Sequence, residues 1–423
     1  RTADINPVEY LYSTNSIQSF QKPKKCRKMR ISIIMIFLLP FLVLSVPAAR
    51  AQTIPDDILR QIEQNNSTLA ALRKKTDAER LGHKTDIYLP GPQADFNYLN
   101  GSPEDIGPRK DMSVRQAFDF PSAYVFRSRI SDLMNDQAEL EYLSHRADVF
   151  FQVRLVLADL VFLNSMSRII SERCENIRKI YELYEMKYDA GEIGIMDLNK
   201  ARLNLLGIQS ELENNNIETA FSLNELARYN GGNRIAFSDT VYAWYPAGQD
   251  FESWFEGARG NNPSLQWIGK EIAAGEVRIR LSRAMNLPRL EAGYMSEKTA
   301  GEQFRGLAMG FSLPLWENRN KIRYEKASLL ASKEMETDYR LQYHEQMKAL
   351  YEKILSLQAS IESFRSALKS ADNRGYLLKA LSGGEISLTE YLLEYGIYYD
   401  SFRKLKEMER EKNRSVAELN RYN

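Results

Sequence analysis

The stretch "AFDFP", Ala117–Pro121, and its near-copy "GFSLP", Gly310–Pro314, decide the fold of this chain. Each alternates apolar with polar or small residues and ends at a proline, which is typical of a short β-strand that stops where the chain changes direction. The phenylalanines Phe118 and Phe311 are 193 residues apart. A strand repeated at so long a distance, in a chain rich in helical patterns, indicates an internal duplication.

Other matches extend the duplication along the chain. "AGEIGIMD", Ala190–Asp197, matches "GGEISLTE", Gly383–Glu390, again at an offset of 193 residues. "NNSTL", Asn65–Leu69, matches "NNPSL", Asn261–Leu265, at an offset of 196. One deletion of three residues between the two sets reconciles them. An ordered series with a single gap predicts two structural repeats rather than chance similarity.

The chain is therefore expected to divide into four parts. Residues 1–51 carry basic residues, an apolar run and a small-x-small end, and are predicted to be a signal peptide with an upstream extension. A membrane anchor is the alternative for this segment. The first repeat is assigned to residues 52–229, the inter-repeat linker to 230–260 and the second repeat to 261–423. Export would make the outer membrane accessible to the chain.

Each repeat shows the same predicted order of helix, β-hairpin, long helix, turn and helix. Period-2 alternation predicts strands at Gln93–Leu99, Ser113–Phe120, Arg289–Met295 and Gly306–Leu313. Polar loops rich in turn residues connect the strands of each pair, so each pair is expected to form a hairpin. Two outcomes remain open for these strands: a membrane barrel shared by several protomers, or a soluble hairpin flap that caps a coiled coil.

The helices are expected to be long and paired. After Pro121 and Pro314, which are expected to begin a helix, each repeat runs for roughly 60 residues, or about 90 Å, with few helix breakers. Apolar residues in steps of three and four, from Met347 to Leu368, predict a heptad seam. Glycines at Gly191 and at Gly383–Gly384 then predict a tight turn and a returning antiparallel helix.

Composition argues against several other classes of protein. The 57 basic and 56 acidic residues nearly cancel, which gives no basic field for nucleic acid. The three histidines are scattered, and no helix-spaced cluster predicts a metal site or another cofactor site. No phosphate loop, nucleophile elbow or paired-carboxylate motif is present, so the chain is not expected to be an enzyme. Cys174 is expected to be a small packed side chain.

The repeat order, together with "YDAGEIGIMDLNKARLNLL", Tyr188–Leu206, resembles the TolC-like outer-membrane efflux proteins over residues 53–423. The second copy, "LSGGEISLTEYLLEYG", Leu381–Gly396, matches the start of the motif but has Leu and Glu where the family often has Asp and Ala. The resemblance implies a mainly α fold with a small transmembrane β part. Three protomers, with four β-strands each, would form a 12-stranded barrel and an α-helical periplasmic tunnel of long antiparallel coiled-coil hairpins.

The resemblance also implies a function and partners. It implies a homotrimer in the outer-membrane lipid that serves as the passive exit duct of a tripartite efflux or secretion system. A periplasmic adaptor (membrane-fusion) protein and an inner-membrane pump, such as an RND transporter, would be its partners. The alternative is a periplasmic coiled-coil scaffold or adaptor that has the same hairpins but forms no channel.

Site residues follow from the resemblance, position by position. Asp197 and Glu390 are implied to constrict the periplasmic aperture; the alternative for both is a charge that stabilises a helix N-terminus. The tip turns implied to dock the adaptor are Gly191, Glu192, Gly384 and Glu385. In the strand pattern, Arg115 and Asp119 oppose the apolar residues and are expected to face the barrel lumen.

Overall fold

A computed structural model describes residues 56–242 and 250–422 of the chain. The chain divides into two units, residues 1–50 and 51–423. The predicted signal peptide lies outside the described residues, as does part of the predicted linker, residues 243–249. All of the described residues belong to the second unit.

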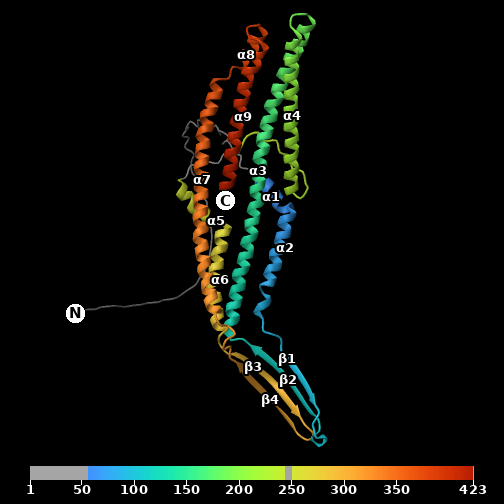
Figure 1. Cartoon of the computed structure of the whole chain (residues 1–423), viewed down its shortest axis with the longest axis vertical. Coiled ribbons are helices and arrows are strands. Elements are labelled where there is room, and N and C mark those ends of the chain that lie inside the picture. Colours follow the sequence, from blue (N-terminus) through green and yellow to red (C-terminus); the bar gives the residue numbers. More distant parts are fainter. Residues whose placement is uncertain (1–55, 243–249, 423) are drawn as a thin grey trace, which may run out of the picture. The chain divides into compact units, whose positions relative to one another are not determined.

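The first repeat begins with two short helices that lead into a β-hairpin and two long helices (Figure 1). Its elements are α1 (Asp56–Asn65), α2 (Ser67–Gly82), η1 (Thr85–Ile87), β1 (Gln93–Leu99), η2 (Glu104–Ile106), β2 (Arg109–Phe118), α3 (Pro121–Asp189) and α4 (Ile195–Tyr229). The second repeat has the same order: α5 (Phe251–Asn261), α6 (Pro263–Ala284), β3 (Arg289–Lys298), β4 (Gln303–Ser312), α7 (Lys321–Ser370), α8 (Arg374–Ser382) and α9 (Leu388–Leu419).

All but the last residue of α5 lies inside residues 230–260, the predicted linker; Asn261 was assigned to the second repeat. The buried residues of α5, Phe251, Phe255 and Ala258, follow a helical spacing that the sequence analysis did not use. Asn262 then begins α6 by accepting hydrogen bonds from the backbone amides of Ser264 (2.9 Å) and Leu265 (3.3 Å). Asn66 caps α2 in the same way, so α5 and α6 are the counterparts of α1 and α2.

Proline begins the long helix in the first repeat but not in the second. Pro121 is the first residue of α3, where its missing N–H costs no helical hydrogen bond. After Pro314 the chain instead makes an irregular loop, and α7 begins only at Lys321, so the expectation for Pro314 is wrong. The side chain of Asn318 fastens this loop by donating to the carbonyl of Met285 (2.8 Å). Asn320 then turns the chain in a left-handed conformation (φ 67°) that asparagine tolerates.

The long helix of the second repeat is also shorter than predicted. It ends at Ser370, and α8 begins at Arg374 after a break that contains Asp372 and Asn373. Both residues favour turns because their short side chains hydrogen-bond to nearby backbone. The carboxylate of Asp372 accepts from the backbone amide of Arg374 (3.4 Å) and from its guanidinium (2.9 Å). The break therefore has a local cause in the sequence.

The helices bury their seams against one another. On α7, Met347, Ile354, Ile361 and Leu368 are buried at a spacing of seven residues, as the heptad prediction requires. Helix α3 contacts α2, α4, α6 and α9 and so joins the two repeats. A core near the tip turns contains Cys174, packed and buried as expected, together with residues of α3, α4, α8 and α9.

Among the described residues, one helix, α3, is long and apolar enough by composition to cross a membrane. More than half of its most apolar window is buried against the rest of the unit. This burial is typical of a core helix, and the contacts of α3 with four other helices account for its apolar character.

Candidate functional site

The four strands form one antiparallel sheet in the order β1-β2-β3-β4. Strand β2 of the first repeat pairs with β3 of the second, from Lys110 opposite Lys298 to Phe118 opposite Leu290. All four strands overlap their predicted positions. Strand β1 has the predicted bounds, β2 begins four residues earlier and ends two earlier, β3 ends three residues later, and β4 begins three residues earlier and ends one earlier. Strands β1 and β4 each have one neighbour, so the sheet has two free edges within the described chain.

One face of the sheet is largely apolar; its polar residues are Gln116 and Ser296, with Lys110, Lys298, Gln303 and Arg305 at its far end. Because directly opposed residues share a face, the register places Phe96, Met112, Val114, Phe118, Leu290, Ala292, Tyr294, Leu307, Met309 and Phe311 together. The apolar side chains of β4 are the most exposed of these, with Leu307 83 % and Met309 86 % exposed. No described helix covers this face in Figure 1. An uncovered apolar surface of this extent on a regular sheet marks a contact with lipid or with another protein.

The opposite face of the sheet is polar and internally paired. The guanidinium of Arg115 contacts the carboxylates of Asp95 (2.7 Å) and Glu291 (3.5 Å) across three strands. Gly293, which lies opposite Arg115, makes this possible, because a β-carbon there would lie 2.9 Å from the Arg115 side chain. A second cluster joins Arg109 to Asp111 (2.9 Å) and Glu297 (3.2 Å). Arg115 thus lies on the polar face, as the alternation predicted.

Asp119 lies one residue beyond the end of β2, at the junction between the sheet and α3. Its carboxylate pairs with Arg127 of α3 (2.5 Å) and with Arg289 of β3 (3.3 Å). Its backbone amide donates to the hydroxyl of Tyr124 (3.0 Å). Asp119 therefore ties the two repeats together at this junction, a role that the strand pattern alone did not suggest.

The two predicted tip turns have the same backbone geometry. Gly191 and Gly384 both adopt φ 75°, which glycine reaches without strain. In each turn the following glutamate closes a six-residue loop: the amide of Glu192 donates to Lys187 (2.8 Å) and that of Glu385 to Ala380 (2.9 Å). All four of these turn residues are exposed. Lys200 and Thr389, which lie just beyond the two turns, approach to 3.4 Å, so the turns share one end of the unit (Figure 1).

Asp197 and Glu390 occupy matching places but have different local partners. Asp197 lies in the first turn of α4, with its side chain half exposed and paired with Lys200 (3.2 Å). Glu390 belongs to a capping box, in which its carboxylate accepts from the backbone amide and the hydroxyl of Ser387, both at 2.8 Å. The backbone hydrogen bond, followed by that of the hydroxyl, lowers the pKa of Glu390. Glu390 is thus a helix cap, whatever else it does.

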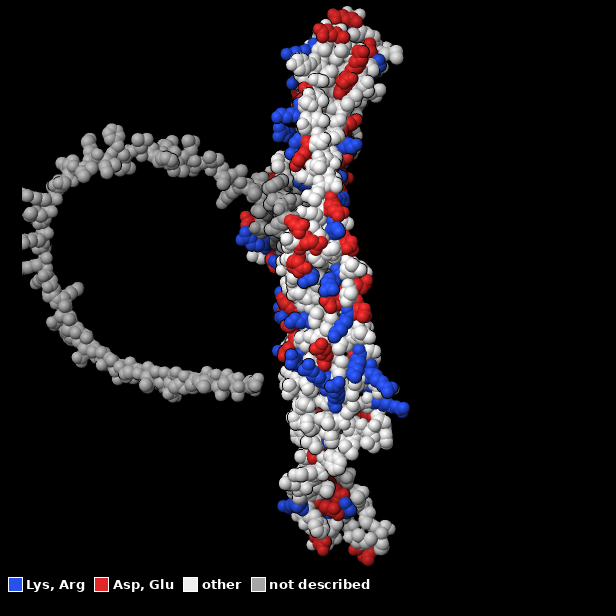
Figure 2. Space-filling view, turned by 90° about the vertical axis from the view of Figure 1, so that its left-hand side faces the viewer, with Lys and Arg blue, Asp and Glu red and all other residues white. Residues whose placement is uncertain are grey.

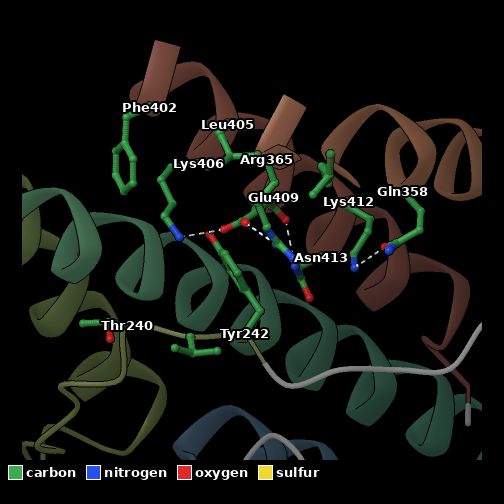
Figure 3. A pocket seen from close by; sticks show the side chains of 12 residues that line it. Thr240, Tyr242, Gln358, Arg365, Phe402, Leu405, Lys406, Glu409, Lys412 and Asn413 are labelled. Atoms are coloured by element: carbon green, nitrogen blue, oxygen red, sulfur yellow. Dashed lines mark hydrogen bonds and ion pairs between the residues drawn. The ribbon is translucent and has the colours of Figure 1, made fainter. Parts of the chain in front are cut away.

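A buried charge cluster that was not predicted from the sequence lies where the linker meets α7 and α9 (Figure 3). Glu409 of α9 is buried and accepts hydrogen bonds from Arg365 (2.6 Å) and Lys406 (2.9 Å). Burial would raise the pKa of Glu409, but these hydrogen bonds outweigh it and hold the pKa below its ordinary value. The cluster borders a cavity of about 540 Å³. In the sequence, Glu409 follows the seam residue Leu405 by four positions, and a charged residue at such a position could have indicated the cluster.

The linker residue Tyr242 lies beside this cluster and fastens the segment to α3. Its hydroxyl donates to the carbonyl of Ala158 (3.1 Å), and burial raises the pKa of the phenol. Asn164 of α3 also donates to the linker carbonyl of Asp239 (3.2 Å). Across residues 56–242 and 250–422, no group of three or more His, Cys, Asp or Glu side chains is placed to hold a metal ion.

These features define a class of protein that combines long helical hairpins with an antiparallel sheet that has one largely apolar and one polar face. Solved outer-membrane channels have the same fold. OprN is 15 % identical, with 87 % of this chain and 89 % of that chain covered and a TM-score of 0.71. CmeC of Campylobacter jejuni is 13 % identical, with 87 % and 84 % covered and a TM-score of 0.69. VceC of Vibrio cholerae is 13 % identical, with 86 % and 94 % covered and a TM-score of 0.68.

The chain therefore has the fold of the TolC-like outer-membrane channels. The predicted mainly α architecture, with long antiparallel helical hairpins and four β-strands, is confirmed by these similarities. No protein-family model matches the sequence, and no curated protein matches it either.

Proposed function

We propose that this protein is an outer-membrane channel, the passive exit duct of a tripartite efflux or secretion system. The observation that carries the proposal is the two-faced sheet. Its apolar face is bare, whereas its polar face is covered by ion pairs between strands. A sheet in a membrane needs this division, with apolar residues toward lipid and polar residues toward a lumen. Three of the four strands, β2, β3 and β4, are ten residues long, the length that spans a bilayer, and β1 has seven.

The free edges of the sheet support a homotrimer. Backbone groups at the edges of β1 and β4 have no partner within the described chain, and lipid offers them none. Pairing β1 of one copy with β4 of the next is a head-to-tail contact that closes into a ring. Four strands are too few for a barrel with a lumen, and three copies give twelve. Exposed apolar residues on the outer sides of α4 and α7, such as Leu203 and Leu341, offer further contacts between copies.

In this assembly the polar face lines the lumen, and Arg115 lies there with its acidic partners. Asp119 is placed at the lower rim of the barrel, where it joins the strands to the helical tunnel through Arg127 and Arg289. The first repeat, residues 52–229, and the second, residues 261–423 preceded by α5, each contribute one β-hairpin and one helical hairpin. Residues 1–51 would direct export.

The tip turns form the entrance of the tunnel in this proposal. Asp197 and Glu390 would line the periplasmic aperture, where threefold symmetry multiplies each charge. The exposed turns at Gly191–Glu192 and Gly384–Glu385 would receive a periplasmic adaptor protein, which in turn would bind an inner-membrane pump such as an RND transporter. A passive duct needs no catalytic group, which fits a protein that is not an enzyme.

A periplasmic scaffold without a channel is the alternative, and the bare face argues against it. A soluble protein would expose the side chains of Leu307, Met309 and Phe311 to water along the whole of β4. Soluble proteins cover a surface of this kind with a helix or replace its outward residues with polar ones.

Fractionation and conductance test the proposal together. The mature protein should be found in outer-membrane fractions and should form ion-conducting pores in planar lipid bilayers. Recovery as a soluble periplasmic species would contradict the channel. Asp197→Asn combined with Glu390→Gln should reduce cation selectivity or cation block. A matched control, Glu213→Gln with Glu334→Gln, removes the same charge from exposed helix positions away from the turns and should leave both unchanged.

A further inference from the structure

The junction segment, Leu313–Lys326, connects β4 to α7 and has the sequence "LPLWENRNKIRYEK". Its first half exposes large apolar side chains, with Leu315 72 % and Trp316 77 % exposed. Its second half exposes four cations: Arg319, Lys321, Arg323 and Lys326. The segment thus joins an apolar surface directly to a basic one.

These cations have no acidic partner within residues 56–242 and 250–422. None of the four forms an ion pair with any residue that the structure describes, whereas both carboxylates of the segment are directed elsewhere. Glu317 pairs with Arg289 of β3 (3.1 Å). Glu325 is half-buried beside Arg278 of α6, whose pKa is raised mainly by its hydrogen bond with Glu271 and to a lesser degree by the charge of Glu325. The segment therefore presents a net positive surface to its surroundings.

The packing of α7 shows which side of the segment is covered. Ile322, Glu325 and Leu329 are partly buried and share one side of the helix. Leu329 packs on α6 so closely that a β-carbon on Gly275 would lie 3.2 Å from it. Arg323 and Tyr324 point away from that contact and are exposed. The basic side of the segment is thus the side that α6 does not cover.

The apolar half of the segment continues the apolar face of the sheet. Leu313 follows Leu307, Met309 and Phe311 in the same alternation, and Trp316 comes three residues later. Aromatic side chains with a polar tip, followed by lysine and arginine, are typical of the boundary between membrane and water. Along the chain, an apolar strand is therefore followed by an exposed tryptophan and then by the basic start of a helix.

The first repeat lacks this segment, so the fold does not require it. There the chain passes from β2 to α3 with two residues between, and Arg127 is neutralised by Asp119. In the second repeat further exposed cations, Arg280 and Arg283, lie at the end of α6, the helix against which α7 begins. Figure 2 shows Lys and Arg gathered on the helices next to the sheet.

We propose that the junction segment binds the headgroups of anionic phospholipids at the periplasmic surface of the outer membrane. Trp316 and Leu315 enter the interfacial layer, and Arg319, Lys321, Arg323 and Lys326 contact the lipid phosphates. The inference rests on the proposed function, since it requires the sheet to lie in a membrane. A basic residue at an anionic surface strengthens binding by roughly fivefold. Four such residues give a preference that can be measured.

Binding of a fluorescent phosphatidylglycerol to the full-length protein in neutral detergent tests the proposal. Unlabelled phosphatidylglycerol should compete at least tenfold better than phosphatidylcholine, and inorganic phosphate should not compete. The variant with Arg319→Gln, Lys321→Gln, Arg323→Gln and Lys326→Gln should bind the probe at least tenfold more weakly. The control variant replaces four exposed cations farther along the helices with Gln and should bind within twofold of the unaltered protein; its positions are Arg340, Lys348, Lys369 and Lys404.

Two single variants guard against misfolding of the fourfold variant. Arg323→Gln and Trp316→Ala should each weaken probe binding severalfold while helix content and pore formation stay the same. Equal competition by the two phospholipids, or an equal loss in the control variant, would overturn the proposal. So would competition by inorganic phosphate, or a change in pore selectivity without a change in lipid binding, because the segment would then face the lumen. Absence of pores from the unaltered protein would instead contradict the proposed function, and the lipid site with it.

Discussion

The two repeats share one plan, but their long helices differ. Helix α3 runs unbroken for 69 residues, whereas the second repeat divides the same distance between α7, a break, and α8. Helix α3 buries 21 of its residues against neighbours on several sides, and α7 buries 5 of its 50. A helix packed on several sides cannot tolerate a break without losing core contacts, whereas a helix packed on one side can. Position in the bundle decides where a break is tolerated, and Asp372 and Asn373 supply the local turn that makes it in the second repeat.

The largest expected effect comes from breaking α3 where its counterpart is already broken. Lys179 lies in α3 at the place that corresponds to Asp372, by the offset of 193 residues. Lys179→Pro should destabilise the protein by about 3 kcal/mol or more, because proline removes a helical hydrogen bond and clashes with the preceding turn. Asp372→Pro should cost less than half as much. Thermal unfolding followed by circular dichroism measures both, and equal losses would show that the two helices are equally constrained.

Removal of the charge cluster on α9 should have the next largest effect. Glu409→Gln leaves Arg365 and Lys406 without a charged acceptor and should cost about 1–2 kcal/mol, a value reduced because Arg365 is 61 % exposed. Asn215 is a buried polar residue of α4 in the first repeat and donates to the carbonyl of Leu163 (3.1 Å) without any charge. The two repeats should therefore differ in how their buried polar positions respond to pH.

The pH dependence follows from the lowered pKa of Glu409. A carboxylate with a folded-state pKa below its unfolded value of 4.5 contributes stability above pH 4.5 and loses it as pH falls through the folded value. Stability of the unaltered protein should fall below pH 4.5, and Glu409→Gln should reduce that slope. The exposed Glu213→Gln serves as control and should leave the slope unchanged. An unaltered slope in Glu409→Gln would mean that other carboxylates carry the acid sensitivity.

The tip turns should respond equally, because their geometry is the same in both repeats. Gly191→Ala and Gly384→Ala each place a β-carbon at φ 75° in open space, so strain in the backbone is the main cost. Each should destabilise its hairpin by about 1 kcal/mol. Hydrogen exchange of the backbone amides at the N-terminal starts of α4 and α9, next to the turns, measures the local loss of stability. A difference of more than twofold between the two variants would break the equivalence of the turns.

The smallest expected effect is a difference in stability between variants that affect the two acidic residues near the turns, Asp197 and Glu390. Asp197→Asn removes one exposed ion pair with Lys200 and should change stability by less than about 0.5 kcal/mol. Ser387→Ala opens the capping box of Glu390 and should cost more, about 1 kcal/mol. Thermal unfolding of the two variants decides the order. A larger loss for Asp197→Asn would assign it a structural role and weaken its assignment to the aperture.

Periodic patterns made most of the fold predictable from the sequence. Alternation placed β1 at the observed residues, and the heptad seam placed Ile354 and Ile361 in a core. The glycine turns were also found, because positive φ leaves few other residues to choose. Features that depend on contacts between distant segments were missed. The loop after Pro314 is fastened by Asn318 to Met285, and no local pattern records such a bond.

In the candidate site, too, local patterns were predictable from the sequence and contacts between distant segments were not. The alternation of apolar and polar residues was enough to assign Arg115 to the polar face. Its partner Glu291 belongs to the other repeat, and the two meet only because β2 pairs with β3. The role of Asp119 as a junction residue, and the burial of Glu409, likewise depend on packing between repeats. Sequence periodicity assigns a residue to a face of one element, and tertiary pairing then decides which charges meet.

In the proposed channel, the apolar face of the sheet would set the thickness of membrane that the protein fits. Along β2 the apolar part of this face runs from Phe118 to Met112, which is about 20 Å along the strand and about 16 Å after the tilt usual in barrels. At its far end the same face carries Lys110, Lys298 and Arg305. Cations at both ends oppose vertical displacement, because each would have to enter hydrocarbon. A bilayer with a thicker core than this span would have to thin locally around the protein, at a cost that rises with the mismatch.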